Sequence, residues 1–169
     1  MAHWSDRDGR TALFCAIAMS LWPVVTACIQ MPGANALPGS LRAHMSEDRF
    51  DVVTSVRGLP LGVREELQTL FQSTFLDIAD PGAAFRATDA VSQPNLPTRR
   101  LAMAACSIDH CLVYYERGGS ARTWHVTLFH WTAAATRFEW GGIAPGGLGT
   151  IDSLRKAALS GAITTSGSW

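Results

Sequence analysis

The amino-acid sequence predicts an α+β fold, in which an antiparallel meander of four or five strands is flanked by two short amphipathic helices. Consecutive segments rich in β-branched and aromatic residues are separated by breaks that suit hairpins and are too short for parallel crossovers. A segment with helical periodicity precedes them and another follows them. An N-terminal segment typical of an export signal or a membrane anchor comes before this domain.

Composition indicates a folded domain without an excess of either charge. The chain has 169 residues, 47% of them hydrophobic and 17% charged, with 14 Lys and Arg against 14 Asp and Glu. The apolar fraction is sufficient for a core, which argues against intrinsic disorder. We expect no nucleic-acid partner, because holding phosphates through a basic surface needs a positive excess that this chain lacks.

Residues 1–28 are typical of a lipoprotein-type signal peptide or a membrane anchor. Thr11–Ile29 is a run without a charged residue, as in the apolar region of export signals. Val25–Cys28 resembles a bacterial lipobox, in which Cys28 would be the lipidated residue. Cleavage after Ala36 and retention as a membrane helix are the alternatives. Through this motif alone the chain resembles small bacterial exported lipoproteins, and we expect a periplasmic protein held at the membrane by a lipid or an anchor.

The rest of the chain is expected to divide into three parts. Residues 29–49 are rich in Pro, Gly, Ala and Ser and lack periodicity, so they are predicted to form a flexible tether. Residues 50–161 hold the regular patterns and are expected to form the single α+β domain. Residues 162–169 are small and polar up to Trp169 and are predicted to be a tail.

Two helices and a leading strand are expected around the meander. Phe50–Val56 has the β-branched composition of a strand. Gly62–Thr74 has apolar residues at helical spacing, with charged and amide side chains between them. A second helix is predicted to follow Thr150, which suits the N-cap, and to end near Ser160, with Gly161 suited to a left-handed C-cap.

The four central strands are expected to be joined by tight turns. Their predicted ranges are Arg99–Cys106, Cys111–Arg117, Thr123–Thr132 and Arg137–Trp140. With Gly118–Ala121 as the loop of the middle hairpin, Tyr115 would lie opposite Trp124, and Tyr114 opposite His125. This register places a consistent apolar set on one face of the hairpin.

Cys106 and Cys111 are predicted to form a disulfide. With Ser107–His110 as a turn, the two cysteines lie opposite each other in the first hairpin, and an oxidising compartment would keep them joined. Two free thiols, or a zinc half-site with His110, are the alternatives, but the C-x4-C spacing lacks a second ligand pair. Because the closed loop is small, the bridge is expected to contribute only about 2 kcal/mol.

The histidines do not predict a metal site, and no cofactor is expected. His125 and His130 are five residues apart on one expected strand, so they should point to opposite faces. His110, beside Asp109 in a turn, is the better candidate for a reactive group, although such turn residues are usually only solvated. The glycine-rich Gly141–Gly149 matches neither a P-loop nor a dinucleotide-binding motif, and we expect a flexible connection there.

Signatures of catalysis are weak, and no catalytic residue is assigned. The sequence contains no G-x-S-x-G elbow. Glu116 and Glu139 lie on expected strands and could form an acid–base pair across a cleft. Solvent-facing positions, screened by nearby arginines, are the expected outcome for both.

Aromatic residues are dense in the expected sheet and suggest a binding surface. Phe129 and Trp131, together with His125, are predicted to form an exposed patch for a protein or glycan partner in the cell envelope. The alternative is that helices cover both faces of the sheet and bury these side chains.

The function predicted from these patterns is that of an exported cell-envelope lipoprotein that acts as a non-catalytic binding or inhibitory module. Two alternatives remain open at this point. One is a small periplasmic hydrolase that uses His110 and Asp109 or a carboxylate pair, and the other is a structural envelope lipoprotein. A cleft in which His110, Asp109 and a glutamate converge would favour the hydrolase.

Overall fold

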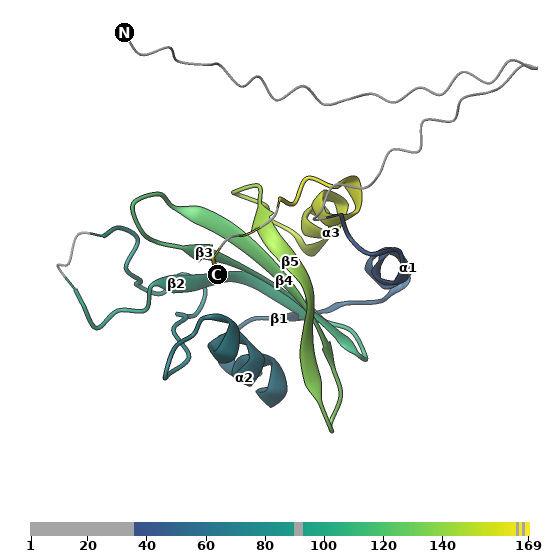
Figure 1. Ribbon diagram of the computed structural model, residues 1–169, viewed down its shortest axis with the longest axis horizontal. Coiled ribbons are helices and arrows are strands. Elements are labelled where there is room, and N and C mark those ends of the chain that lie inside the picture. The colour runs from purple at the N-terminus through teal and green to yellow at the C-terminus, as the bar shows by residue number, and fades with distance from the viewer. Residues whose placement is uncertain (1–35, 90–92, 165, 167) are drawn as a thin grey trace, which may run out of the picture. The chain divides into compact units, whose positions relative to one another are not determined.

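A five-stranded antiparallel sheet with three helices forms the folded part of the chain, which is the predicted α+β class (Figure 1). The computed structural model describes residues 36–89, 93–164, 166, 168 and 169. Its elements are α1 (Gly39–Glu47), β1 (Asp51–Val53), the 3-10 turn η1 (Val56–Gly58), α2 (Leu61–Leu70), β2 (Arg99–Cys106), β3 (His110–Arg117), β4 (Thr123–Trp131), β5 (Thr136–Ala144) and α3 (Ile151–Ser160). The strands pair in the order β1-β2-β3-β4-β5, so the predicted meander is confirmed.

The β2–β3 hairpin has the predicted register. Cys106 lies opposite Cys111, with Cα atoms 4.1 Å apart, and the two residues are joined by a disulfide. Ser107 closes the turn between them. Its backbone N–H donates to the carbonyl oxygen of His110 at 2.7 Å, and its hydroxyl oxygen accepts the His110 N–H at 3.1 Å. A covalent bond and two hydrogen bonds therefore hold this turn.

The β3–β4 hairpin is shifted by one residue from the predicted register. Arg117 pairs with Thr123, so the loop spans residues 118–122, and Tyr115 lies opposite His125 instead of Trp124. The prediction was wrong because the length of the loop sets the pairing, and one additional loop residue changes every partner along the ladder.

Helices α1 and α3 cover one face of the sheet. Leu41 and Met45 of α1 and Leu154 of α3 enter a core built on side chains of β3, β4 and β5. Arg155 of α3 donates from Nε to the carbonyl oxygen of Met45 at 2.6 Å, which ties the two helices together. Residues 39–47 are thus a packed helix and not the expected tether. Only two apolar side chains, four residues apart, mark its buried side, so packing and not intrinsic propensity stabilises it.

Helix α2 and η1 cover the opposite face, as Figure 1 shows for α2. Val63 and Leu67 of α2 are fully buried against apolar side chains of the sheet. The helix ends at Leu70, earlier than the predicted Thr74, and Gln72 follows it with a left-handed φ of 52°. Both faces of the sheet are therefore covered.

The described residues after α3 contact the sheet instead of extending as a free tail. Thr164 and Ile143 of β5 exchange two backbone hydrogen bonds of 2.9 Å each. The ring of Trp169 meets the ring of Phe138 edge to face, with centroids 5.2 Å apart. β5 itself continues to Ala144, into the glycine-rich stretch that was expected to be a flexible connection.

The predicted signal features, including residues 1–28 and the lipidation site Cys28, lie outside the described residues. A cleavage site after Ala36 would fall at the beginning of the described part. Among the helices of that part, none has the length and hydropathy needed to cross a membrane.

Candidate metal centre

Four metal-ligating side chains from two distant segments meet at one end of the sheet. His44 lies in α1, and Asp48, one helical turn later, is the C-cap residue of that helix. Asp109 lies in the β2–β3 turn, and His110 is the first residue of β3. One donor atom from each residue lies within 4.8 Å of every other one. These four residues are called the His–Asp cluster below.

The donor atoms have the spacing of ligands around a common ion. Nδ1 of His44 is 3.1 Å from Oδ2 of Asp48, and Nδ1 of His110 is 2.8 Å from Oδ1 of Asp109. The two halves approach each other at Nδ1 of His110 and Oδ2 of Asp48, 3.9 Å apart. Neighbouring donors in a tetrahedral zinc site, with bonds of about 2.0–2.1 Å, stand roughly 3.3 Å apart. An ion between the four groups would therefore require only small side-chain shifts.

Rigid elements hold both halves of the cluster. The Cys106–Cys111 disulfide closes the turn that carries Asp109 and His110. On the other half, Met45, the residue after His44, is fully buried and anchors α1 in the core. The hydroxyl of Ser107 lies 3.4 Å from Oδ2 of Asp48, so the turn and the end of α1 are also in polar contact.

Glu139 of β5 lies on the far side of the His110 ring. Its Oε2 is 3.4 Å from Nε2 of His110 and, among the described residues, has no hydrogen-bond partner. Its other oxygen accepts from Nη2 of Arg137 at 2.6 Å. Metal-bound histidines commonly face a carboxylate with their second ring nitrogen, which fixes the tautomer and raises the basicity of the ligand atom. Glu139 stands in that position.

Both ring nitrogens of His110 face carboxylates. Nδ1 lies 2.8 Å from Oδ1 of Asp109 and 3.9 Å from Oδ2 of Asp48, and Nε2 lies 3.4 Å from Oε2 of Glu139. A neutral imidazole carries one proton, so it can donate from one of its nitrogens only. When that proton is on Nε2, the lone pair of Nδ1 is available to bind a metal ion.

The charge of Asp109 suits a ligand role. Burial alone would raise the pKa of its carboxyl group, but the hydrogen bond with His110 and the nearby rings of His110, His44 and His130 together lower it. The carboxylate is therefore ionised at neutral pH. The ring of His130 packs against that of His110 edge to face, with centroids 5.4 Å apart.

The cluster is open to solvent on one side. The side chains of His44, Asp48 and Asp109 are 40%, 25% and 36% exposed, whereas that of His110 is 3% exposed. A hydrated ion can thus reach His44, Asp48 and Asp109 from solvent, whereas His110 is buried.

Sequence reasoning identified half of this cluster. His110 and Asp109 were considered, but as solvated turn residues, whereas His110 is buried. His44 and Asp48 were missed because they were placed in a tether. A histidine followed by an aspartate four residues later is a usable signal only once a helix is recognised there.

The predicted exposed aromatic patch does not exist as such. His125 is 1% exposed and Phe129 is fully buried, while Trp131 is half-buried. The alternative interpretation, in which helices cover both faces of the sheet and bury these side chains, is correct for His125 and Phe129. Their side chains lie on the face that α2 covers.

The suggested carboxylate pair does not form either. Glu116 is buried at the Arg117 end of β3, where it pairs with Arg100. Glu139 lies at the opposite end of the sheet, beside His110. The two glutamates therefore belong to different networks.

No protein-family model, curated protein or solved structure matches this chain. Its function must be inferred from the chemistry of its own side chains. Two imidazole nitrogens and two carboxylate oxygens form a donor set that suits Zn²⁺ and neighbouring transition metals, whereas Mg²⁺ and Ca²⁺ prefer oxygen ligands alone.

Proposed function

We propose that this protein is an exported, non-catalytic metal-binding module, and that the His–Asp cluster holds one divalent transition-metal ion, with Zn²⁺ the best match. The observation that carries the proposal is the convergence of His44, Asp48, Asp109 and His110, whose donor atoms lie within 4.8 Å of one another. Glu139 supplies the outer carboxylate that such a site requires. Binding would replace protons on the imidazoles with the ion.

Binding accounts for the cluster better than hydrolysis does. Asp109, His110 and a glutamate do converge, as the hydrolase alternative requires. Both ring nitrogens of His110, however, face carboxylates, and the ring is 3% exposed. A general base must have a nitrogen within reach of the substrate. His110 is therefore placed to orient and hold an ion.

Export is supported by the signal-like segment and by the disulfide. The uncharged run Thr11–Ile29 and the lipobox-like Val25–Cys28 are features of exported lipoproteins. The Cys106–Cys111 bridge is of a kind that persists in oxidising compartments. We propose that Cys28 carries the lipid and that the metal-binding domain lies outside the cytoplasm.

Titration of the metal-free full chain with ZnCl₂, followed by calorimetry, tests metal binding. We expect one ion per chain. Loss of a residue that only contacts a metal ligand typically weakens metal binding 10–100-fold. His44 and Asp48 are proposed to bind the ion directly, so His44→Ala and Asp48→Asn are expected to weaken zinc binding by roughly 100-fold or more. Both residues are partly exposed, so both variants should fold. Asp152→Asn, at a carboxylate 93% exposed on α3, is the matched control.

The result that would overturn this function is equally clear. Zinc binding that is absent in the full chain, or unchanged in His44→Ala and Asp48→Asn, would remove the His–Asp cluster as a metal site. Export is tested separately by the intact mass of the protein recovered from the envelope fraction, measured with and without reductant. A mass that includes residues 1–27 would contradict lipidation at Cys28.

A further inference from the structure

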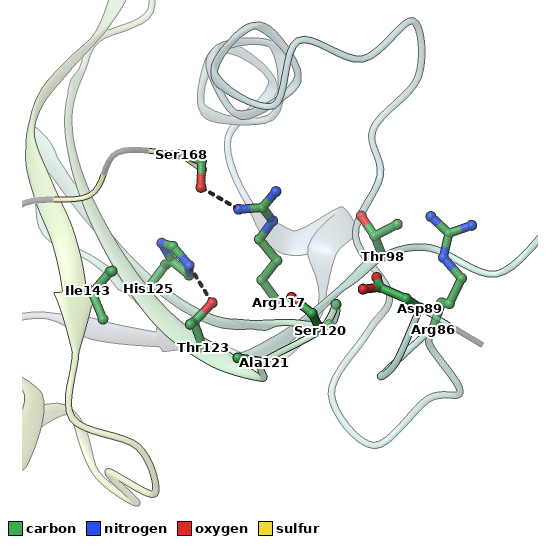
Figure 2. A pocket seen from close by; sticks show the side chains of 12 residues that line it. Arg86, Asp89, Thr98, Arg117, Ser120, Ala121, Thr123, His125, Ile143 and Ser168 are labelled. Carbon is green, nitrogen blue, oxygen red and sulfur yellow. Dashed lines mark hydrogen bonds between the residues drawn. The ribbon is translucent and has the colours of Figure 1, made fainter. Parts of the chain in front are cut away.

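A second site lies at the opposite end of the β3–β4 hairpin from the His–Asp cluster. A cavity of about 430 Å³ opens there beside the β3–β4 loop (Figure 2). It is called the Arg117 pocket, and the lining residues that matter here are Arg86, Asp89, Arg117, Ser120, His125 and Ser168. β3 spans eight residues between the two sites, which corresponds to roughly 23 Å from its first to its last Cα atom at about 3.3 Å per residue.

Close backbone packing builds the wall of this pocket. The N–H of Gly118 donates to the carbonyl oxygen of Thr98 at 2.9 Å, and that of Gly119 to Ala87 at 3.4 Å. A Cβ atom at position 118 would overlap the carbonyl oxygen of Arg86. Glycine is therefore needed at this position, because only it lets the segment before β2 lie against the β3–β4 loop.

Two arginines give the pocket a positive charge. Nη1 of Arg117 donates to the hydroxyl of Ser168 at 2.6 Å, as the dashed line in Figure 2 shows. Within the described part of the chain, neither Arg117 nor Arg86 forms an ion pair with a carboxylate. Asp89 is the acidic residue among the described lining residues, so the formal charge of the lining is positive by one.

His125 also lines the pocket and adds no charge at neutral pH. It is 1% exposed, and its Nε2 lies 2.9 Å from the hydroxyl oxygen of Thr123. Burial, with contributions from the positive charges of Arg117 and Arg99, lowers the pKa of His125 to about 4. His125 therefore leaves the net positive charge of the lining unchanged.

We propose that the Arg117 pocket binds a small molecule through an oxyanion group, either a carboxylate or a phosphate. A guanidinium group holds both kinds of anion through paired N–H donors. The guanidinium of Arg117 points toward Ser168, and Ser120 lines the same cavity near the base of the Arg117 side chain. The volume is in the range of pockets for small metabolites.

Titration of the isotope-labelled full chain with inorganic phosphate and, separately, with citrate tests this proposal by NMR at constant ionic strength. We expect saturable shifts of the amide signals of residues 118–121 and of the His125 ring. Arg117→Gln is expected to weaken binding by at least 10-fold, and Arg86→Gln is the second variant in case the first fails to fold. Arg49→Gln, at a side chain that is 90% exposed, is the control.

Bound anion is also expected to raise the titration midpoint of His125, because it stabilises the imidazolium form. Saturation by phosphate alone or by citrate alone identifies which oxyanion the pocket prefers. Shifts that remain linear with concentration, or that are the same in wild type, Arg117→Gln and Arg86→Gln, would overturn the proposal. The outcome is independent of zinc binding, because the two sites share no residue.

Discussion

Substitution of Glu139 by Gln tests the metal centre without removing any of its proposed ligands. The wild-type carboxylate lies 3.4 Å from Nε2 of His110 and is 15% exposed. Gln keeps the size of the side chain and can still accept a hydrogen bond, but it removes the negative charge that faces Nε2 of His110. Outer-shell changes of this kind weaken metal binding by about 10–100-fold, which is roughly 1.4–2.7 kcal/mol.

The assay is a competition titration of Zn²⁺ against a chelating dye for wild type and Glu139→Gln. We expect a loss near the lower end of that range, because the Gln side chain keeps a carbonyl oxygen that can face Nε2 of His110 and only the charge is lost. The thermal midpoint of the metal-free variant should remain close to that of wild type, whereas the stabilisation by zinc should decrease. Asp152→Asn again controls for the loss of one negative charge.

The refuting result is specific. If Glu139→Gln binds zinc as tightly as wild type while His44→Ala does not, the cluster binds metal but Glu139 does not orient His110. If the variant binds zinc more tightly, Glu139 does not act as the outer carboxylate that makes His110 a better ligand.

Four further outcomes concern stability. The pKa of His125 in the folded state is lowered to about 4, so between about pH 6.5 and 4 only the unfolded state binds a proton at this residue. The free energy of unfolding should therefore fall as the pH decreases through that window, by roughly 3 kcal/mol at most. In urea unfolding, His125→Gln should show a weaker dependence of this free energy on pH. Arg99→Ala leaves the carboxylate of Asp77 buried without its partner, and urea unfolding should report a loss of about 3–5 kcal/mol; a loss below 1 kcal/mol would contradict the buried pair. Gly118→Ala should lower the free energy of unfolding by about 2 kcal/mol or more, because the added Cβ would overlap the backbone of Arg86. A thermal midpoint equal to that of wild type would show that the backbone at residue 86 can move away from position 118. Reduction of the Cys106–Cys111 disulfide should lower the free energy of unfolding by about 2 kcal/mol. Calorimetry with and without reductant should detect a lower thermal midpoint, and an unchanged midpoint would contradict this contribution.

The sequence by itself determined the features that depend on neighbouring residues. The cysteines pair as predicted because a short turn brings both ends of one hairpin together. The second predicted helix begins after Thr150, whose hydroxyl accepts the N–H of Ser153 at 3.1 Å. It ends at Ser160, and the C-cap Gly161 has a left-handed φ of 78°. Caps and turns are made by side chains within a few residues, so their signals are readable in order along the chain.

Features that depend on packing between distant segments were decided only by the tertiary structure. Helix α1 has too little apolar surface to be recognised alone and is stabilised by contact with α3 and the sheet. Burial of His125 follows from covering the second face of the sheet, which no local pattern reports. The His–Asp cluster joins residues 44 and 48 to residues 109 and 110. Side chains so far apart in sequence become neighbours only when the long-range core places α1 beside the β2–β3 turn. The free energy of that packing is absent from any short stretch of sequence.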